Sequence, residues 1–164
     1  MRRRITSALW LLCVTLAAGA AGAQKFPSRA IQFVVPLAAG STTDVAARMI
    51  AQRVAERLDA QIIIENKPGA STMLGSAMVA RAEPDGHTLL MGASSLAVNQ
   101  NLFKTVPYDT EKDFAPITLL VTAPMVLVVN PDLGVATLAE FLAKFRGTQN
   151  VTFASPGAGT SLHL

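Results

Sequence analysis

The stretch AIQFVVPLAAGSTTD, residues 30–44, decides the fold. Its first part, Ile31–Val35, is a continuous apolar run, which is typical of a strand buried on both faces of a parallel sheet. A loop of small and hydroxyl-bearing residues follows, and any of residues 41–43 can cap the amphipathic helix predicted from about Asp44 to Leu58. Backbone N–H groups and the positive end of a helix dipole then lie together, which is how an α/β protein binds an anion.

The alternation of strand and helix continues along the chain. Apolar runs at Ile62–Ile64 and Thr88–Met91 predict two further strands, and a helix capped by Ser71 or Thr72 is expected between them, through Arg81. Strand, helix, strand, helix, strand at this spacing implies right-handed crossovers and a parallel sheet. Since ligands of such sheets bind outside the carboxyl ends of the strands, the loops that follow the strands are the candidate site.

The pattern changes after the third strand. Residues 99–114 are expected to be irregular, and the apolar runs 117–121 and 125–129 predict either an antiparallel pair or one strand bent between two domains. Thr137 is expected to cap a helix through Phe145, followed by a strand at residues 151–154. A second loop of small residues closes the sequence, so the chain has two loops of the same kind.

The first 23 residues have the pattern of a secretory signal peptide. Three arginines precede an apolar core from Ile5 to about Ala18, and Ala21-Gly22-Ala23 forms a small-x-small cleavage site. The apolar core is shorter than the ~20 residues that a spanning helix needs. We therefore expect cleavage, a periplasmic location and no stable membrane insertion afterwards.

Charge and cysteine content exclude several classes of partner. Three of the 14 basic residues and none of the 11 acidic ones lie in the signal, so the mature part is electrically balanced and no nucleic-acid partner is expected. Cys13 also lies in the signal, and the mature part has only His87 and His163. No disulfide, zinc site, other metal or cofactor is therefore expected.

Six motifs in order along the chain carry a resemblance to a known family. They are VPLAAGSTTD (35–44), ENKPGA (65–70), PDGHTLL (84–90), PYD (107–109) with DFAP (113–116), LVVNP (127–131) and SPGAGTSLHL (155–164). Behind a signal peptide they resemble the tripartite tricarboxylate transporter receptors, also called Bug proteins. The likeness covers nearly the whole mature chain.

The resemblance implies a type II periplasmic-binding-protein-like α/β fold, with two parallel-sheet lobes and the ligand between them. Such a receptor captures a small carboxylate and delivers it to the membrane permease subunits of a tripartite transporter. The implied division is a signal peptide (1–23), a first lobe (24–120) and the start of a second lobe (121–164). Because family members are much longer, we expect an incomplete second lobe and a fragment that neither binds ligand well nor folds stably alone.

Carried over by position, the resemblance implies two ligand-binding loops, which we call the first loop (residues 36–44) and the second loop (residues 155–161). The implied site residues are Ala38, Gly40, Ser41, Thr42, Thr43 and Asp44 in the first loop, and Gly157, Gly159, Thr160 and Ser161 in the second, with Ser94 and His163 as further candidates. Neither loop contains Arg or Lys, so backbone N–H groups, hydroxyls and helix dipoles would hold the anion.

Several alternatives stay open at this point. Asp44 either contacts a ligand amino group or serves its own helix. A receptor of this kind can also feed a sensor or regulatory partner instead of a transporter. An exported hydrolase would need a nucleophile, a base and an orienting group, but the sequence has no G-x-S-x-G motif and little choice of histidine.

Overall fold

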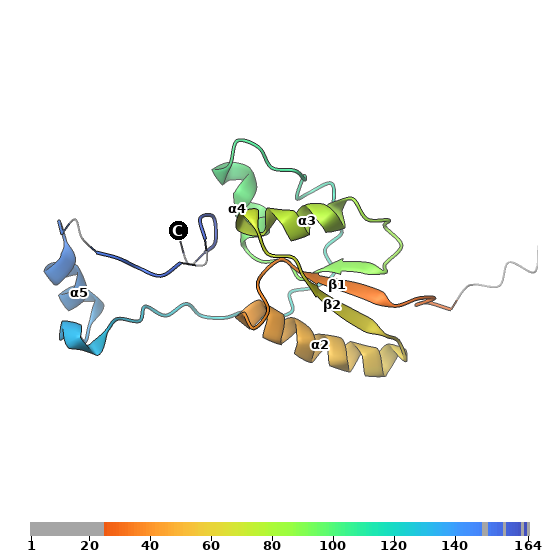
Figure 1. Ribbon diagram of the computed structural model, residues 1–164, viewed down its shortest axis with the longest axis horizontal. Helices are drawn as coiled ribbons and strands as arrows, with labels where there is room; N and C mark the ends of the chain where they lie inside the picture. Colours follow the sequence, from red (N-terminus) through yellow and green to blue (C-terminus); the bar gives the residue numbers. More distant parts are fainter. Residues whose placement is uncertain (1–24, 149–150, 156, 162, 164) are drawn as a thin grey trace, which may run out of the picture.

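The computed structural model describes residues 25–148, 151–155, 157–161 and 163. Its sheet consists of three parallel strands, β1 (Ile31–Val35), β2 (Ile62–Asn66) and β3 (Thr88–Leu90), in the order β2-β1-β3 (Figure 1). The parallel sheet and its three strands confirm the prediction from the sequence. The signal peptide predicted for residues 1–23 lies outside the described residues.

Helices cover both faces of this sheet. α2 (Thr42–Leu58) joins β1 to β2, and the short 3-10 helix η1 (Ala70–Thr72) with α3 (Met73–Ala80) joins β2 to β3. Figure 1 shows α2 on one side of the sheet and α3 on the other. The two connections cross the sheet in opposite directions, so right-handed crossovers place their helices on opposite faces.

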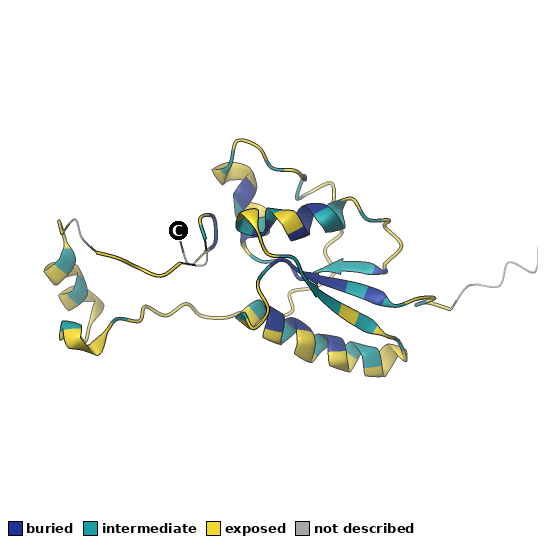
Figure 2. Cartoon of the chain, in the orientation of Figure 1, coloured by how far each residue is buried: buried dark blue, intermediate teal, exposed yellow. Residues whose placement is uncertain are grey.

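The core forms around the central strand. Val34 and Val35 are completely buried, and Phe33 and Val35 pack with Ala47, Ala51 and Met91. In Figure 2 buried residues lie on β1, on the side of α2 that faces it, and on α3 and α4. A continuous apolar run suits β1 because both of its faces are covered.

The prediction of irregular structure for residues 99–114 was wrong at its start, because residues 99–102 belong to the helix α4 (Ser95–Leu102). This helix was missed because its middle is polar and its apolar spacing is weak over only two turns. Asn99 is fully buried despite its polarity, and its amide donates to the Ser71 carbonyl and the Tyr108 hydroxyl. Hydrogen bonds to distant residues therefore help to hold this helix in place.

The strands predicted at 117–121, 125–129 and 151–154 were also wrong. These segments are non-helical and mostly exposed, with Ile117 at 78% and Val128 at 82% of full exposure. Within the described residues no neighbouring strand pairs with them. A strand needs a partner for its N–H and C=O groups, so an apolar run alone does not create one.

The remaining elements follow these extended segments. η2 (Pro131–Leu133) is a short 3-10 helix, and α5 (Leu138–Phe145) begins at the predicted cap. Thr137 and Glu140 form a reciprocal capping box, which confirms the cap. In the described part of the chain, no helix combines the length and the apolar character needed to cross a membrane.

Candidate functional site

The first loop ends in a capped helix whose leading N–H groups have no acceptor within the helix. Ser41 is the N-cap of α2, and its hydroxyl accepts a hydrogen bond of 3.3 Å from the Asp44 N–H. Thr42 and Thr43 are the first two helical residues, so their N–H groups have no acceptor within the helix. Ala38, Gly40 and Thr42 are exposed, and Ser41 and Thr43 are half-buried.

Gly40 makes the turn into this helix possible. Its φ of +82° lies in the left-handed region, and no atom lies within 4 Å of the place a Cβ would take. The Ser41 N–H donates to the Ala38 carbonyl at 3.2 Å, which closes the turn. A residue with a side chain would be strained here by its backbone alone, so glycine is required.

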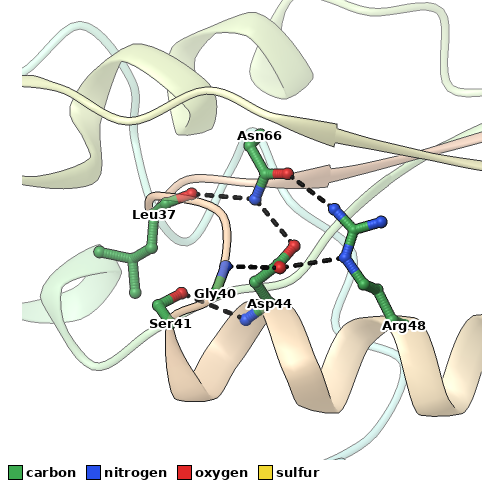
Figure 3. Close-up of polar contacts among 6 residues, drawn as sticks. All are labelled: Leu37, Gly40, Ser41, Asp44, Arg48 and Asn66. Atoms are coloured by element: carbon green, nitrogen blue, oxygen red, sulfur yellow. Dashed lines mark hydrogen bonds and ion pairs between the residues drawn. The ribbon is translucent and has the colours of Figure 1, made fainter.

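Asp44 is buried in a network that joins the first loop to β2 (Figure 3). One carboxylate oxygen, Oδ2, accepts from the Gly40 N–H at 2.9 Å and from Arg48 Nε at 3.0 Å. The other, Oδ1, accepts from Asn66 Nδ2 at 2.9 Å. Asn66 Nδ2 also donates to the Leu37 carbonyl at 3.1 Å, and Asn66 Oδ1 accepts from Arg48 at 3.0 Å.

These contacts keep Asp44 ionised. The hydrogen bond from Arg48 is the largest cause that holds the pKa of the Asp44 carboxyl well below its ordinary value, and the Gly40 N–H and Asn66 act in the same direction. The ion pair with Arg48 also cancels the negative charge. Of the two roles left open for Asp44, the geometry favours the structural one, in which its carboxylate stabilises its own loop and helix.

Arg48 and Asn66 were not among the sequence-derived candidates. Arg48 follows Asp44 by four residues, a spacing at which opposite charges pair on a helix, so this partner carried a readable signal. Asn66 had a weaker signal, namely its place two residues after the predicted strand Ile62–Ile64, in the motif ENKPGA. Its contacts reach 22 and 29 residues back along the chain, which local patterns do not reveal.

The loop after β3 opens at the same edge of the sheet as the first loop. Ser94 is exposed at the N-cap of α4, where its side chain makes no capping bond. The next residue, Ser95, is buried, and its hydroxyl lies 2.8 Å from that of Thr72. The chain passes from β1 to β2 on one side of β1, and β3 lies on the other side. The gap between the carboxyl ends of β1 and β3 is therefore a topological switch point, where ligands of such sheets bind.

The second loop lies against η1 and α4. The Ser71 hydroxyl donates to the Ala158 carbonyl, and Gly159 is buried beside Asn99 and Phe103. Thr160 is also buried, and its hydroxyl donates to the Gly157 carbonyl at 2.7 Å. Among the described residues, the hydrogen bonds of this loop to the rest of the fold go to Ser71 and not to the first loop.

The last candidates are exposed. Ser161 and His163 both face solvent, and His163 Nδ1 lies 2.9 Å from the Ser155 hydroxyl. The His163 ring also packs on Phe153, with ring centres 5.6 Å apart. In the part of the chain that is described, no group of three or more His, Cys, Asp or Glu residues could hold a metal ion.

The chain belongs to the tripartite tricarboxylate transporter receptor family, whose model matches residues 46–164. A UPF0065 protein from the tcbD-tcbE intergenic region of Pseudomonas sp. strain P51 is 37% identical, over 99% of this chain and 49% of the relative. Protein BugT of Bordetella pertussis is 34% identical, over 87% of this chain and 44% of the relative. The chain thus spans about half the length of the curated relatives it matches.

Solved structures agree with this family. A Rhodopseudomonas palustris protein solved with adipate superposes with a TM-score of 0.71 at 32% identity, over 74% of this chain and 41% of that one. MatC from Rhodopseudomonas palustris, solved with bound malate, gives 0.51 at 40% identity, over 58% and 33%. The periplasmic binding protein BugD gives 0.54 at 37% identity, over 56% and 31%. The predicted periplasmic-binding-protein fold, present in part, is confirmed.

Proposed function

We propose that the chain is a periplasmic solute receptor that grips a small carboxylate through the first loop. The observation that carries the proposal is that Thr42 and Thr43 are the first two residues of the long helix α2, so their N–H groups have no acceptor within the helix. The nearest acidic side chain, Asp44, is neutralised by Arg48 and does not repel an anion. Family membership supports the proposal, and so do relatives solved with adipate and malate.

The proposed ligand groups are uncharged. The first loop would contribute N–H groups and hydroxyls, and each helix dipole adds about 0.3–1 kcal/mol at an exposed site or up to ~2 when partly buried. Such modest terms need a second contact that excludes water. The proposed second contact consists of Ser94, Gly157, Gly159, Thr160, Ser161 and His163.

We propose weak binding by this chain alone. The second loop lies on η1 and α4 rather than across the first loop, so a ligand at Thr42 and Thr43 stays open to water. The proposed division into a first lobe (24–120) and the start of a second (121–164) places the two loops on different lobes. Closure of one lobe on the other would then supply the missing contact.

Delivery to the permease subunits of a tripartite transporter is the proposed physiological role, after removal of the signal peptide. The alternative is a receptor that feeds a regulatory partner. The two differ in their neighbouring genes: permease subunits beside this gene support transport, and a sensor kinase supports regulation.

The binding proposal is tested by replacing one N–H group without disturbing the helix. Proline suits position 42 because it is the first helical residue and Ser41 is already extended, with φ −66° and ψ 158°. Titration of the ¹⁵N-labelled chain with malate and adipate should shift the amide signals of Thr42 and Thr43. Proline has no amide signal of its own, so the readout in Thr42→Pro is the Thr43 amide: its shift should be lost in Thr42→Pro and mostly retained in Thr42→Ala, which keeps the N–H.

The diamides of malate and adipate serve as neutral ligands of the same shape and should produce no shifts at these positions. Equal responses to the acids and the diamides would contradict anion recognition. Equal shifts of the Thr43 amide in the Thr42→Pro and wild-type chains would place the site elsewhere.

One observation bears on the hydrolase alternative. Ser155 and His163 are within hydrogen-bond distance, as a nucleophile and its base would be. Both side chains are exposed, and in the described part of the chain no acidic side chain hydrogen-bonds His163 to orient it. We propose that the chain is not an enzyme. Incubation with a panel of esters and amides should give no hydrolysis above that of Ser155→Ala.

A further inference from the structure

We infer that Asn66 and Arg48 are positioning residues of the first loop, and that with Asp44 they form a closed, neutral brace. The brace fixes the N–H groups of Thr42 and Thr43, which have no acceptor within the helix, and leaves no free negative charge beside them. The loop therefore selects carboxylates without using a ligand ammonium group. This inference rests on the proposed function, because it names what sets the geometry and specificity of that same site.

Asn66 reaches from the end of β2 to the first loop. It is the last residue of β2 and lies opposite Val35 of β1, and the next N–H, that of Lys67, donates to the Val35 carbonyl at 2.8 Å. From this sheet position its side chain bonds both the Leu37 carbonyl and the Asp44 carboxylate (Figure 3). The N-cap Ser41 holds only the first turn of α2. Asn66 ties the whole first loop to the sheet.

Every hydrogen-bonding group of the Asn66 side chain has a partner. A carboxamide offers two N–H donors and one oxygen acceptor. The donors go to Leu37 and Asp44, and the oxygen accepts from Arg48. Asp44 is 2% exposed and also accepts from the Gly40 N–H and Arg48 Nε. Asn66 is half-buried and the Arg48 side chain is 52% exposed, so the buried centre of the network is the Asp44 carboxylate. A hydrogen-bond network whose buried member is fully satisfied rigidifies its surroundings.

The first loop carries no unpaired charge. Asp44 is the single acidic residue of the first loop, residues 36–44. Because its carboxylate is buried and paired with Arg48, it neither repels a ligand carboxylate nor reaches a ligand ammonium group. An α-amino group on the ligand therefore gains nothing from this loop. The substrate class that follows is the simple carboxylic acids, with no preference for amino acids.

Removal of the Arg48 charge should shift the selectivity of the loop toward amino acids. Arg48→Met keeps an apolar stem of similar length but leaves Asp44 unpaired. The affinity for succinate should fall about tenfold or more, since a hydrogen-bonded charge loses its partner. Aspartate, which has the same carboxylates plus an ammonium group, should lose less. A change in the succinate-to-aspartate ratio is a readout that general loosening of the loop would not produce.

Replacement of Asn66 tests the geometric part of the brace. Asn66→Asp is isosteric, but it puts an acceptor in place of the two donors that face Leu37 and Asp44. The amide proton of Gly40, which is bonded to Asp44, should then exchange with solvent about tenfold faster or more. Should this variant not fold, the same exchange measurement on Arg48→Met decides the point.

The experiment uses the full chain, labelled with ¹⁵N and titrated with succinate and aspartate, together with amide exchange at Gly40. Arg53→Met is the matched control for charge loss on α2, because Arg53 is exposed and pairs only with exposed Glu56 among the described residues. Asn101→Asp, at an exposed position of α4, controls for the asparagine change. Both controls should behave as the wild type does.

The outcomes separate the brace from the proposed function. If the wild type responds to no carboxylate, the proposed function fails, and exchange at Gly40 still tests the brace. If the wild type binds succinate and aspartate alike and Arg48→Met changes their ratio, the inference is supported. Unchanged ligand ratio and unchanged Gly40 exchange in both variants would overturn it.

Discussion

Gly159 lies so close to the ring of Phe103 that a Cβ at position 159 would be 2.9 Å from the ring carbon Cε2. The same Cβ would lie 3.1 Å from Oδ1 of Asn99. The second loop therefore lies against α4 only because this residue has no side chain. The contact joins the region that carries the second loop to the helices of the sheet domain.

Gly159→Ala should release the second loop. The φ of +82° costs an L-residue about 1–2 kcal/mol, and overlap with Phe103 adds to it. Amide protection at residues 157–161 should fall, and proteolysis near the loop should increase. The melting temperature should change little, because the core around β1 is untouched.

Gly147→Ala is a matched control for this change. Gly147 has nearly the same φ, +81°, but no atom lies within 4 Å of the place its Cβ would take. It therefore tests the backbone cost without the overlap. Equal behaviour of the two variants at residues 157–161 would show that the contact with Phe103 does not hold the loop.

The buried hydroxyl pair between η1 and α4 gives a second prediction. Thr72 Oγ1 and Ser95 Oγ are 2.8 Å apart, and both residues are buried. Thr72→Val or Ser95→Ala should each cost about 1–3 kcal/mol in free energy of unfolding, since the other hydroxyl loses its partner. The double variant should cost less than the two single costs added together. Denaturant melts of the four proteins would measure this, and strict additivity would contradict a direct bond.

Much of the sheet could be predicted from the sequence because its signals are local. The apolar run of β1, the cap residues at 41 and 137 and the glycine at 40 each act within a few residues. Their physical effects, burial, capping and a left-handed turn, do not need the rest of the fold to be known.

The parts that could not be predicted depend on distant partners. Asn66 matters because it meets Leu37 and Asp44, and Asn99 because it meets Ser71 and Tyr108. The apolar runs between 117 and 129 predict strands because strand propensity is local, whereas pairing is not. Pairing decides whether a strand forms.

Acid should weaken the fold partly through Asp44. Its pKa in the folded chain lies below the ordinary value of 3.8, chiefly because of Arg48. The stabilisation by the ionised carboxylate is therefore complete above that value and is lost as pH falls through the lower folded-state pKa. Asp44→Asn should be less stable than the wild type at pH 7, and its stability should depend less on pH below about 5.

Asp85→Asn provides the comparison for this prediction. The His87 backbone N–H, followed by Arg29, lowers the pKa of Asp85 to about 2, but this carboxylate is partly exposed. Replacement of Asp85 should change the pH dependence of the free energy of unfolding below pH 5 less than replacement of Asp44 does. It should also reduce that free energy less at pH 7, because water screens an exposed pair. Urea melts at a series of pH values would test both variants. If the stability of Asp44→Asn falls with pH as steeply as that of the wild type, the Asp44 network does not contribute to acid sensitivity.

The exposed apolar segment from 117 to 129 should make the chain self-associate. Val126 and Val128 are 77% and 82% exposed, and contiguous exposed apolar residues without a covering element favour association. Val126→Lys with Val128→Lys should lower the sedimentation coefficient at high concentration and leave the melting temperature unchanged. Met49→Lys with Leu74→Lys adds the same charge at exposed apolar positions on α2 and α3, outside this segment. If both double variants reduce association equally, added charge and not coverage of the segment is the cause.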